Sequence, residues 1–270
     1  MCLPMLERSA PGPAYSQSLE RGLAILSTFR SGRPLLGVTE IGREVGLGRS
    51  TTHRYVATLA TLGYLQQDVA TKKYRLGPRV LDLGFSAINS MELREVAAPH
   101  LRRLSDDTGY TVNMAILDGL DIVYVERCRS TQAGQREIDL NLHVGARLPA
   151  YCTSLGKVLL AWLPRRDQAA ALELVDFSRR GPNTITSRSA LAAELARVRA
   201  DGFAINNEEL AYGLRSIAAP ILDHQGTAVA AINLAVHSSM VSIDDLSARL
   251  SETVRRAATD ISAHLGYRPG

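Results

Sequence analysis

Residues 38–77 hold the pattern that most limits how this chain can fold: two short helical segments, a glycine turn between them and a basic hairpin after them. Thr39 is expected to cap the first helix, because its hydroxyl can accept a hydrogen bond from a free backbone N–H. Gly46 and Gly48 interrupt the helical pattern, as a tight turn between two helices requires. A second helix is expected over residues 49–62. This order of elements predicts a helix-turn-helix followed by a wing.

The second helix of this pattern has two unlike faces. Its apolar face is expected to pack on the first helix and carries Thr52, Tyr55, Val56, Leu59 and Leu62. The opposite face has short polar and basic side chains near the N-terminus, which predicts contacts with base edges and phosphates in a major groove. The candidate DNA-binding residues of this helix are Arg49, Ser50, Thr51, His53 and Arg54.

The hairpin that follows is basic at its tip. Residues 64–67 and 73–76 are expected to pair around residues 68–72, which places Lys72 and Lys73 near the turn. Phosphates supply most of the affinity of proteins for DNA, so both lysines are candidate DNA contacts. The plainer alternative is a helical hairpin with solvated lysines. The winged DNA-binding unit is favoured because its four parts come in the right order.

The charge distribution supports this interpretation. Residues 1–77 contain ten Lys and Arg against five Asp and Glu, whereas the remaining residues contain 21 against 22. The excess positive charge therefore lies with the candidate DNA-binding unit, and the second part of the chain is expected to have a different task. A DNA-packaging protein fits poorly, because a large and nearly neutral second domain is attached to the basic one.

The cysteines and the apolar segments indicate in which cellular compartment the protein is expected. Cys2, Cys128 and Cys152 are far apart and show no metal-type spacing, which predicts a reducing cytoplasm and no disulfide framework. No apolar run approaches the ~18–20 residues that a membrane span needs. The N-terminus lacks the charged and then apolar layout of a signal peptide. A cytoplasmic protein without a membrane partner is expected.

The pattern along the chain predicts an α+β protein with four segments. Residues 1–15 are rich in Pro and Gly and are expected to be disordered, and residues 16–77 form the winged unit. Its first helix is expected to bury a stripe of Leu19, Leu23, Leu26 and Phe29. Residues 78–91 predict a short amphipathic helix, with Val80, Leu81, Gly84, Ala87 and Ile88 on one face. This face needs a partner, either in its own chain or in a second protomer.

Residues 92–270 predict a second domain of paired strands and helices. A helix around residues 93–109 contains Pro99, at its first turn or at a kink. Two strands are expected on either side of a turn at Asp118-Gly119, and another pair at residues 216–222 and 227–236. Pro220 predicts an edge strand or a bulge in that second pair. Further helices are expected at residues 155–163, before Gly202, and after the cap Ser242.

The second domain also contains a candidate site for a small ligand. Residues 147–156 run from a turn into a helix N-terminus, where backbone N–H groups and two hydroxyls can hold an anion. Residues 206–209 and 214–216 are expected to form a second wall, and Asn233 is a polar residue within an apolar strand. The candidate contacts are Arg147, Tyr151, Cys152, Thr153, Ser154, Leu155, Gly156, Asn207, Glu209, Arg215, Ser216 and Asn233, with Arg127 and Arg136 as further carboxylate partners.

Structural roles compete with these assignments. Arg147 could instead pair with Glu208 or Glu209, and Tyr151 could belong to the core. An enzymatic alternative would use Cys152 as nucleophile and His143 as base, but no third residue that orients them is evident. The sequence shows no phosphate-binding glycine loop and no metal-binding set, so neither a catalytic residue nor a cofactor is expected.

Two pairs of motifs resemble one known family. GRSTTHRYVATLATLGYL with YRLGPRVLDLG resembles the N-terminal domain of the IclR family of bacterial transcription regulators. VGARLPAYCTSLGKVLLA and NEELAYGLRSIAAPI resemble the effector-binding domain of that family, so the similarity extends from about Ser18 to Leu265. The resemblance implies a linker helix that joins two protomers, and a GAF/PAS-like effector domain with a curved antiparallel sheet. It also implies a homodimer, or a dimer of dimers, on a palindromic promoter site.

The resemblance also suggests what the second domain senses. RLPAYCTSLGKVLLA and ELAYGLRSIAAPI look most like the branch of the family that regulates aromatic-acid catabolism, with protocatechuate, p-hydroxybenzoate or β-ketoadipate as effectors. A small carboxylate requires a cationic or N–H-rich end, and an aromatic ring requires apolar walls. The alternative is a regulator of a non-aromatic keto-acid pathway.

Overall fold

A computed structural model describes residues 15–30, 32–89, 92–129 and 142–268, with backbone only for 85–89 and 92. The expected disorder of residues 1–14 and the candidate Arg136 lie outside these ranges. The described residues divide into two compact units, one ending at Met91 and the other beginning at Glu92. Each unit has its own buried core.

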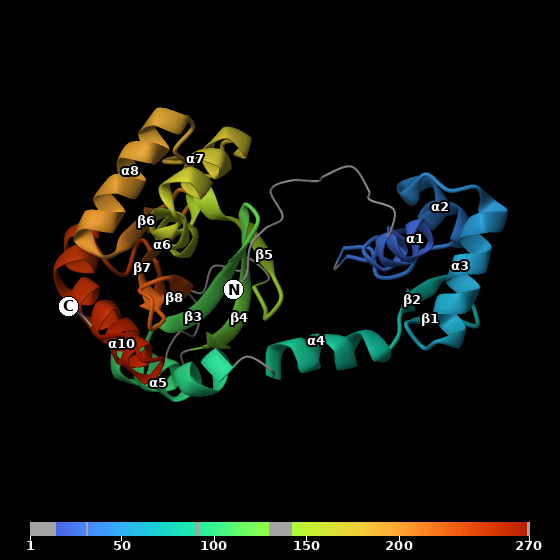
Figure 1. The fold of residues 1–270 in the computed structure, drawn as a ribbon, viewed down its shortest axis with the longest axis horizontal. Coiled ribbons are helices and arrows are strands. Elements are labelled where there is room, and N and C mark those ends of the chain that lie inside the picture. Colours follow the sequence, from blue (N-terminus) through green and yellow to red (C-terminus); the bar gives the residue numbers. More distant parts are fainter. Residues whose placement is uncertain (1–14, 31, 90–91, 130–141, 269–270) are drawn as a thin grey trace. The chain divides into compact units, whose positions relative to one another are not determined.

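The first unit contains the predicted helix-turn-helix and hairpin (Figure 1). Its elements are α1 (Gln17–Leu26), α2 (Val38–Val45), α3 (Arg49–Thr61), β1 (Leu65–Gln67), β2 (Tyr74–Leu76) and α4 (Arg79–Asn89). The two short strands pair antiparallel, with Leu65 opposite Leu76. The core of this unit joins α1, α2 and α3 to the hairpin and consists of Ile25, Phe29, Leu36, Ile41, Val56, Leu65 and Tyr74.

The turn between α2 and α3 depends on two glycines. Gly46 ends α2 with a φ of 68°, in the left-handed region that favours glycine. A Cβ at Gly42 would lie 2.8 Å from both the Leu47 carbonyl and the Thr52 hydroxyl oxygen. Only a hydrogen at Gly42 therefore lets α2 approach the turn and α3 this closely.

The structure corrects three details of the first unit. The helix α2 begins at Val38, so Thr39 is not its cap; Gly37 holds that place, and its N–H donates to the Glu40 carboxylate at 2.8 Å. Leu19 and Leu23 are 64% and 55% exposed, because α1 buries its C-terminal part through Ile25 instead. Leu62 also lies outside the core, since it is the C-cap residue where α3 ends.

The second unit is built around a six-stranded antiparallel sheet in the order β5-β4-β3-β8-β7-β6. The strands are β3 (Thr111–Asp118), β4 (Asp121–Cys128), β5 (Arg147–Pro149), β6 (Ala204–Asn207), β7 (Leu214–Leu222) and β8 (Ala228–His237). The two predicted hairpins are β3–β4 and β7–β8, and β3 pairs with β8 to join them at the centre of the sheet.

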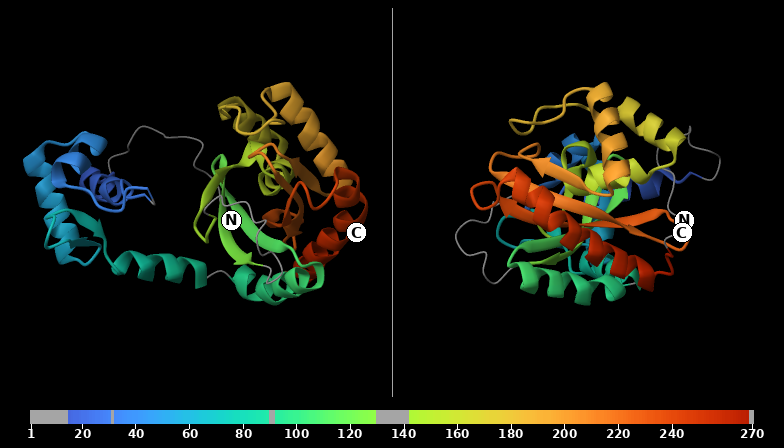
Figure 2. Two further views of the ribbon diagram at one scale, coloured as in Figure 1. Left: turned by 180° about the vertical axis from the view of Figure 1, so that it is seen from behind. Right: turned by 90° about the vertical axis from the view of Figure 1, so that its left-hand side faces the viewer.

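Helices cover both faces of this sheet (Figures 1 and 2). On one face α5 (Glu92–Thr108) and α10 (Ser251–His264) lie side by side. On the other face α6 (Ser154–Trp162) follows the 3-10 turn Ala150–Cys152, and α8 (Arg188–Asp201) and α7 (Arg165–Leu174) pack outside it. The short helix α9 (Ile243–Asp245) and a π-helical turn (Leu246–Leu250) precede α10.

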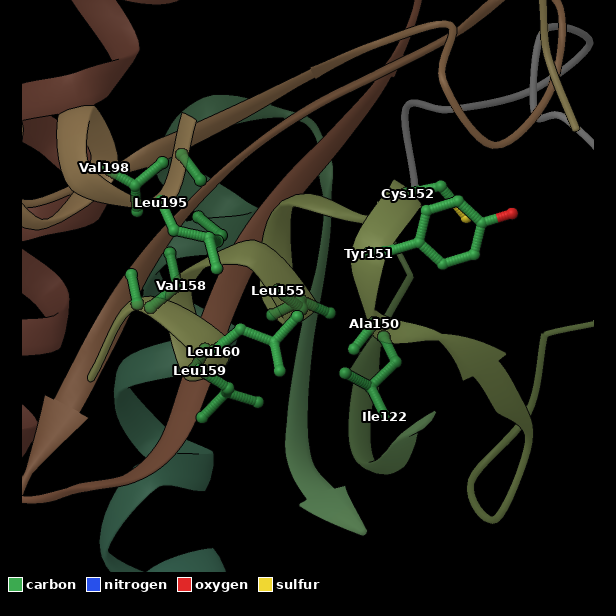
Figure 3. Packing of buried hydrophobic residues seen from close by; sticks show 14 of the residues in the cluster. Ile122, Ala150, Tyr151, Cys152, Leu155, Val158, Leu159, Leu160, Leu195 and Val198 are labelled. Carbon is green, nitrogen blue, oxygen red and sulfur yellow. The ribbon is translucent and has the colours of Figure 1, made fainter. Parts of the chain in front are cut away.

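The core under α6 is continuous with the segment that precedes this helix. Figure 3 shows Leu155, Leu159 and Leu160 of α6 close to Ile122 and Ala150. Leu155 is fully buried, so it belongs to the core and faces no solvent. The unit is the mixed α and β domain that the sequence predicts, with a curled antiparallel sheet.

Two prolines narrow the alternatives that the sequence left open. Pro220 does not lie in an edge strand, because β7 runs between β6 and β8. The pairing with β6 ends at Ala218, however, and a register shift follows at Ile221/Leu222, so the missing N–H of Pro220 lies where the sheet is already irregular. Pro99 lies within α5 rather than in its first turn. None of the helices in the described ranges is long and apolar enough to cross a membrane.

Candidate functional site

The N-terminal half of α3 presents the predicted polar face to solvent. Arg49, Ser50, His53 and Arg54 are exposed, and Thr51 is half-buried. On the opposite side Thr52 is fully buried, and its hydroxyl donates to the Gly48 carbonyl at 3.0 Å. The core contacts of α3 therefore leave its basic residues accessible to a groove of DNA.

The two lysines of the hairpin have different surroundings. Lys72 is exposed at the turn with a φ of 58°, and its carbonyl accepts a hydrogen bond from the Gln67 side chain at 3.0 Å. Lys73 instead pairs with Glu40 of α2, Nζ to Oε2, at 3.2 Å. The N–H of Gly37 and the ammonium of Lys73 both lower the pKa of Glu40. Lys73 thus ties the wing to α2, which the sequence did not indicate.

A further basic residue of the wing was missed. Arg75 is exposed on β2, where its Nε donates to the Gln66 side chain at 3.2 Å. Alternation along the strand could have found it, because Tyr74 is buried and the next side chain must point to the other face.

In the second unit, polar side chains gather on the face of the sheet that α6 covers. Asn113 of β3 pairs with Arg127 of β4 and with Asn233 of β8. Ser216 of β7 pairs with Asn206 of β6. Successive side chains of a strand alternate between faces, and these residues are in step with Ala115, Ala204, Ala218 and Ala231 of the core beneath α6.

Most of these polar groups are buried, and hydrogen bonds link them in two sets. The Arg127 guanidinium donates from Nη1 to Asn113 Oδ1 at 3.3 Å, and Asn113 Nδ2 donates to Asn233 Oδ1 at 2.9 Å. The hydroxyls of Ser154 and Ser216 lie 2.7 Å apart. Ser154, Ser216, Asn113, Asn206 and Asn233 are each less than 5% exposed. One set of bonds joins β4, β3 and β8, and a second joins β7 to the start of α6.

The start of α6 is held in place by its own turn. Thr153 is the N-cap, and its hydroxyl accepts from Gly156 N at 3.0 Å. The Asn206 side chain donates to the Cys152 carbonyl at 2.9 Å, which fixes the turn against β6. A Cβ at Gly156 would lie 2.2 Å from the Ala150 carbonyl oxygen, so Gly156 is needed for this close approach. The positive end of the α6 dipole therefore lies beside Ser154 and Ser216.

Glu209, another candidate contact, serves a buried ion pair. Lys157 is 1% exposed and donates to Glu209 at 2.6 Å, to Glu194 at 2.9 Å and to the Ile205 carbonyl at 2.6 Å. Burial raises the pKa of Glu209 above its usual value, although Lys157 opposes this shift. The pair fastens the loop after β6 to α6 and α8.

Three candidate contacts lie away from this polar cluster. Arg147 is half-exposed and pairs with Asp118 at 2.7 Å and Asp121 at 3.4 Å, rather than with Glu208 or Glu209. Arg215 donates to Asn207 at 2.9 Å and to the carbonyls of Ser238 and Val241. Alternation along β6 and β7 turns Arg215 and Asn207 to the face opposite Ser216 and Asn206. The structure therefore gives these three residues structural partners.

Cys152, the nucleophile of the enzymatic alternative, lies in the buried core. Burial raises the pKa of the Cys152 thiol to about 12, and its Sγ lies 3.7 Å from the Pro149 carbonyl. A thiol with this pKa remains protonated at neutral pH, whereas the nucleophile is the thiolate. Tyr151 packs edge-to-face on Phe177, 5.8 Å between ring centroids, and donates to the Ser178 carbonyl. Both residues belong to the core shown in Figure 3.

Comparison with known proteins identifies what this arrangement is. Residues 18–69 match the IclR helix-turn-helix domain, and residues 85–263 match the C-terminal domain of the bacterial transcriptional regulator IclR. The chain belongs to the IclR family. This IclR-family member is accordingly a DNA-binding transcription regulator and not an enzyme. Its second unit corresponds to the C-terminal domain of this family.

Individual relatives cover nearly the whole chain. The transcriptional regulator XynR of Escherichia coli K12 is 36% identical over 251 residues, which are 93% of this chain and 98% of XynR. The Pca regulon regulatory protein of Pseudomonas putida is 36% identical over 253 residues, 94% of this chain and 85% of that protein. A solved IclR homologue from Microbacterium hydrocarbonoxydans, in complex with 4-hydroxybenzoate, has a TM-score of 0.79 and 27% identity, with 92% of this chain and 99% of that one covered.

Proposed function

We propose that this IclR-family regulator controls genes of aromatic-acid catabolism and that its effector is a small aromatic carboxylate. The observation that carries the proposal is the buried polar cluster at the start of α6, where Ser154 and Ser216 meet beside Asn233. Helix N–H groups, hydroxyls and an amide can together bind a carboxylate. Apolar residues of the core under α6, such as Leu155, supply surface for a ring.

Two relatives support the aromatic class. One is named for the Pca regulon, and another was solved in complex with 4-hydroxybenzoate. We assign the effector contacts to Ser154, Ser216 and Asn233. Asn113 supports Asn233 by a hydrogen bond, and Asn206 supports the turn before α6 through the Cys152 carbonyl. In this proposal, four other candidates stabilise the domain and do not contact the effector: Arg147, Arg215, Asn207 and Glu209.

The DNA is bound by α3 and the wing. Arg49, Ser50, Thr51, His53 and Arg54 enter a major groove, while Lys72 and Arg75 contact the flanking backbone. The regulator acts in the cytoplasm, where the bacterial chromosome lies. Two protomers, or two pairs, bind a roughly palindromic site, since two-fold symmetry in the protein is matched by symmetry in the operator.

The linker helix α4 supports the association of two protomers. Leu81 and Leu83 are 60% and 57% exposed on it. A second copy of α4 packed on the face of Leu81 would bury that side chain and fix the distance between the two copies of α3. Ala87 and Ile88, which the sequence placed on the same face as Leu81, have side chains outside the described residues.

The proposal is tested by measuring operator affinity with and without effector. Full-length protein is titrated onto labelled DNA from the region upstream of its own gene, at fixed salt, with 4-hydroxybenzoate, protocatechuate or pyruvate present. An aromatic effector should change operator affinity roughly 5–150-fold, and operator DNA should change effector affinity by the same factor. A response to pyruvate alone would replace the aromatic class by a keto acid. A response to none of the three would reject the proposed effector.

A further inference from the structure

Three side chains form a directed chain of hydrogen bonds across neighbouring strands. Arg127 on β4 donates to Asn113 on β3 at 3.3 Å, and Asn113 donates to Asn233 on β8 at 2.9 Å. The three residues stand directly opposite one another in the sheet. Asn113 and Asn233 are 1% and 4% exposed, so their amides are withdrawn from bulk water.

The chemistry of arginine fixes the direction of this chain. A guanidinium has N–H donors and no acceptor, so the Asn113 atom that faces Arg127 must be the carbonyl oxygen. The amide nitrogen of Asn113 then points to Asn233 and must meet the oxygen of that amide. This leaves Nδ2 of Asn233 at the far end of the chain of hydrogen bonds. The orientation of two amides, which are otherwise free to flip, is thus set by one charged residue.

The far end of the chain faces the proposed effector site. Asn233 pairs with Ala218 of β7, two positions along the same strand face from Ser216. Diagonal neighbours on one face of a sheet lie close enough for side chains to share a ligand. Ser216 in turn contacts Ser154 at the N-terminus of α6. The N–H donors of Asn233 therefore adjoin two hydroxyls and the positive end of a helix.

We propose that Arg127 is a positioning residue that sets the hydrogen-bond polarity of the effector site. Through Asn113 it holds Asn233 with its amide N–H groups toward the ligand, and the site thereby selects a carboxylate over a neutral amide of the same shape. This inference rests on the proposed function, because it concerns the same site. It differs from a simple charge effect, since Arg127 acts through the orientation of two neutral side chains.

Two probes with one ring test this polarity: 4-hydroxybenzoate and 4-hydroxybenzamide. Their dissociation constants for the full-length protein are measured by calorimetry. The readout is the dissociation constant of the amide divided by that of the carboxylate, called the amide-to-carboxylate ratio. The native protein should prefer the carboxylate by about tenfold or more, because hydrogen bonds to a charged acceptor are stronger than neutral ones. Operator affinity and thermal unfolding serve as folding controls for each variant.

The decisive variants are Asn113→Asp and Arg127→Met, which change the local formal charge by the same one unit. An aspartate only accepts, so Asn233 should turn its Nδ2 toward position 113 and present its oxygen to the ligand. Asn113→Asp should therefore lower the ratio about tenfold further than Arg127→Met, mainly by improving amide binding. Arg127→Lys keeps a cationic donor and should retain the native ratio within about threefold.

The outcomes separate this inference from the proposed function. Equal losses of carboxylate affinity in Asn113→Asp and Arg127→Met, with amide affinity unchanged, would show a charge effect alone and overturn the inference while keeping the effector class. A native protein that binds neither probe would overturn both. Should Asn113→Asp fail the folding controls, Arg127→Met and Arg127→Lys decide: the inference requires the methionine variant to lose the preference and the lysine variant to keep it.

Discussion

The basic face of α3 and the polar cluster beneath α6 differ in the environment of their polar groups, which are exposed on α3 and buried in the cluster. On α3, the side chains of Arg49, Ser50, His53 and Arg54 are exposed and available to a charged partner such as DNA. In the cluster, Ser154, Ser216 and Asn233 are buried, and each already holds another side chain of the chain. The interactions of exposed groups are weakened by solvent and salt, whereas the interactions of buried groups are determined by the neighbouring side chains. The comparison predicts that equal chemical changes will have unequal effects in the two units.

The largest difference is expected for the two paired lysines. Lys157→Met leaves the carboxylates of Glu194 and Glu209 without their buried cation and should cost about 3–5 kcal/mol of unfolding free energy. Lys73→Met removes a solvent-exposed partner of Glu40 and should change stability little. Fluorescence of Trp162, the single tryptophan, reports unfolding of the second unit in urea. Similar midpoints for Lys157→Met and the native protein would refute the structural role of the buried pair.

A glycine in each unit offers the next contrast. Gly156→Ala places a Cβ 2.2 Å from the Ala150 carbonyl oxygen and should destabilise the second unit by about 1–3 kcal/mol or more. Gly84→Ala on α4 meets nothing within 4 Å and should slightly stabilise, because alanine favours a helix. Thermal unfolding of both variants checks this. An unchanged melting temperature for Gly156→Ala would mean that the turn before α6 can relax.

Substitutions on the exposed face of α3 should change operator affinity rather than the stability of the protein. Arg54→Ala should weaken operator binding by about 1–3 kcal/mol if Arg54 contacts a base or phosphate, with unfolding unaffected. Loss of a phosphate contact would also reduce the salt slope by about one. Titrations at several salt concentrations distinguish the two kinds of contact. Unchanged affinity at matched salt would remove Arg54 from the interface.

The reactivity of Cys152 tests whether this residue is a buried core side chain or a nucleophile. Its thiol, with a pKa of about 12, should be alkylated far more slowly in the native protein than in the unfolded one at pH 8. Cys152→Ala should cost about 1 kcal/mol at most of stability and retain effector response and operator binding. Site-resolved mass spectrometry after alkylation supplies the rate. Fast labelling, or a variant that has lost an activity, would reopen the nucleophile interpretation.

The smallest effects are pH trends of opposite sign. Burial raises the pKa of Glu209 above 4.5, so its contribution to stability is present in acid and is lost as pH rises through the raised pKa. The Gly37 N–H and Lys73 lower the pKa of Glu40, so its contribution is present above 4.5 and is lost as pH falls. Comparing Glu209→Gln and Glu40→Gln with the native protein across pH, by Trp162 fluorescence and by hydrogen exchange in α2, should give opposite trends. Parallel trends would contradict the assigned environments.

The sequence by itself determined the first unit and the α+β character of the second. Helix, glycine turn, helix and hairpin are local patterns, because capping, helical periodicity and turn chemistry act over a few residues. For the same reason the exposed residues of α3 could be named from their spacing alone. The family could likewise be identified from short motifs in both units.

Only the tertiary structure decided which polar residues of the second unit belong together. Asn113, Asn206 and Asn233 come from three strands that are far apart in sequence, and strand register brings them to one face. A shift of one residue would have turned Arg215 inward and Ser216 outward. The physical reason is that a buried side chain is placed by its partners across the sheet, which no local pattern specifies, whereas an exposed one is placed by its own helix.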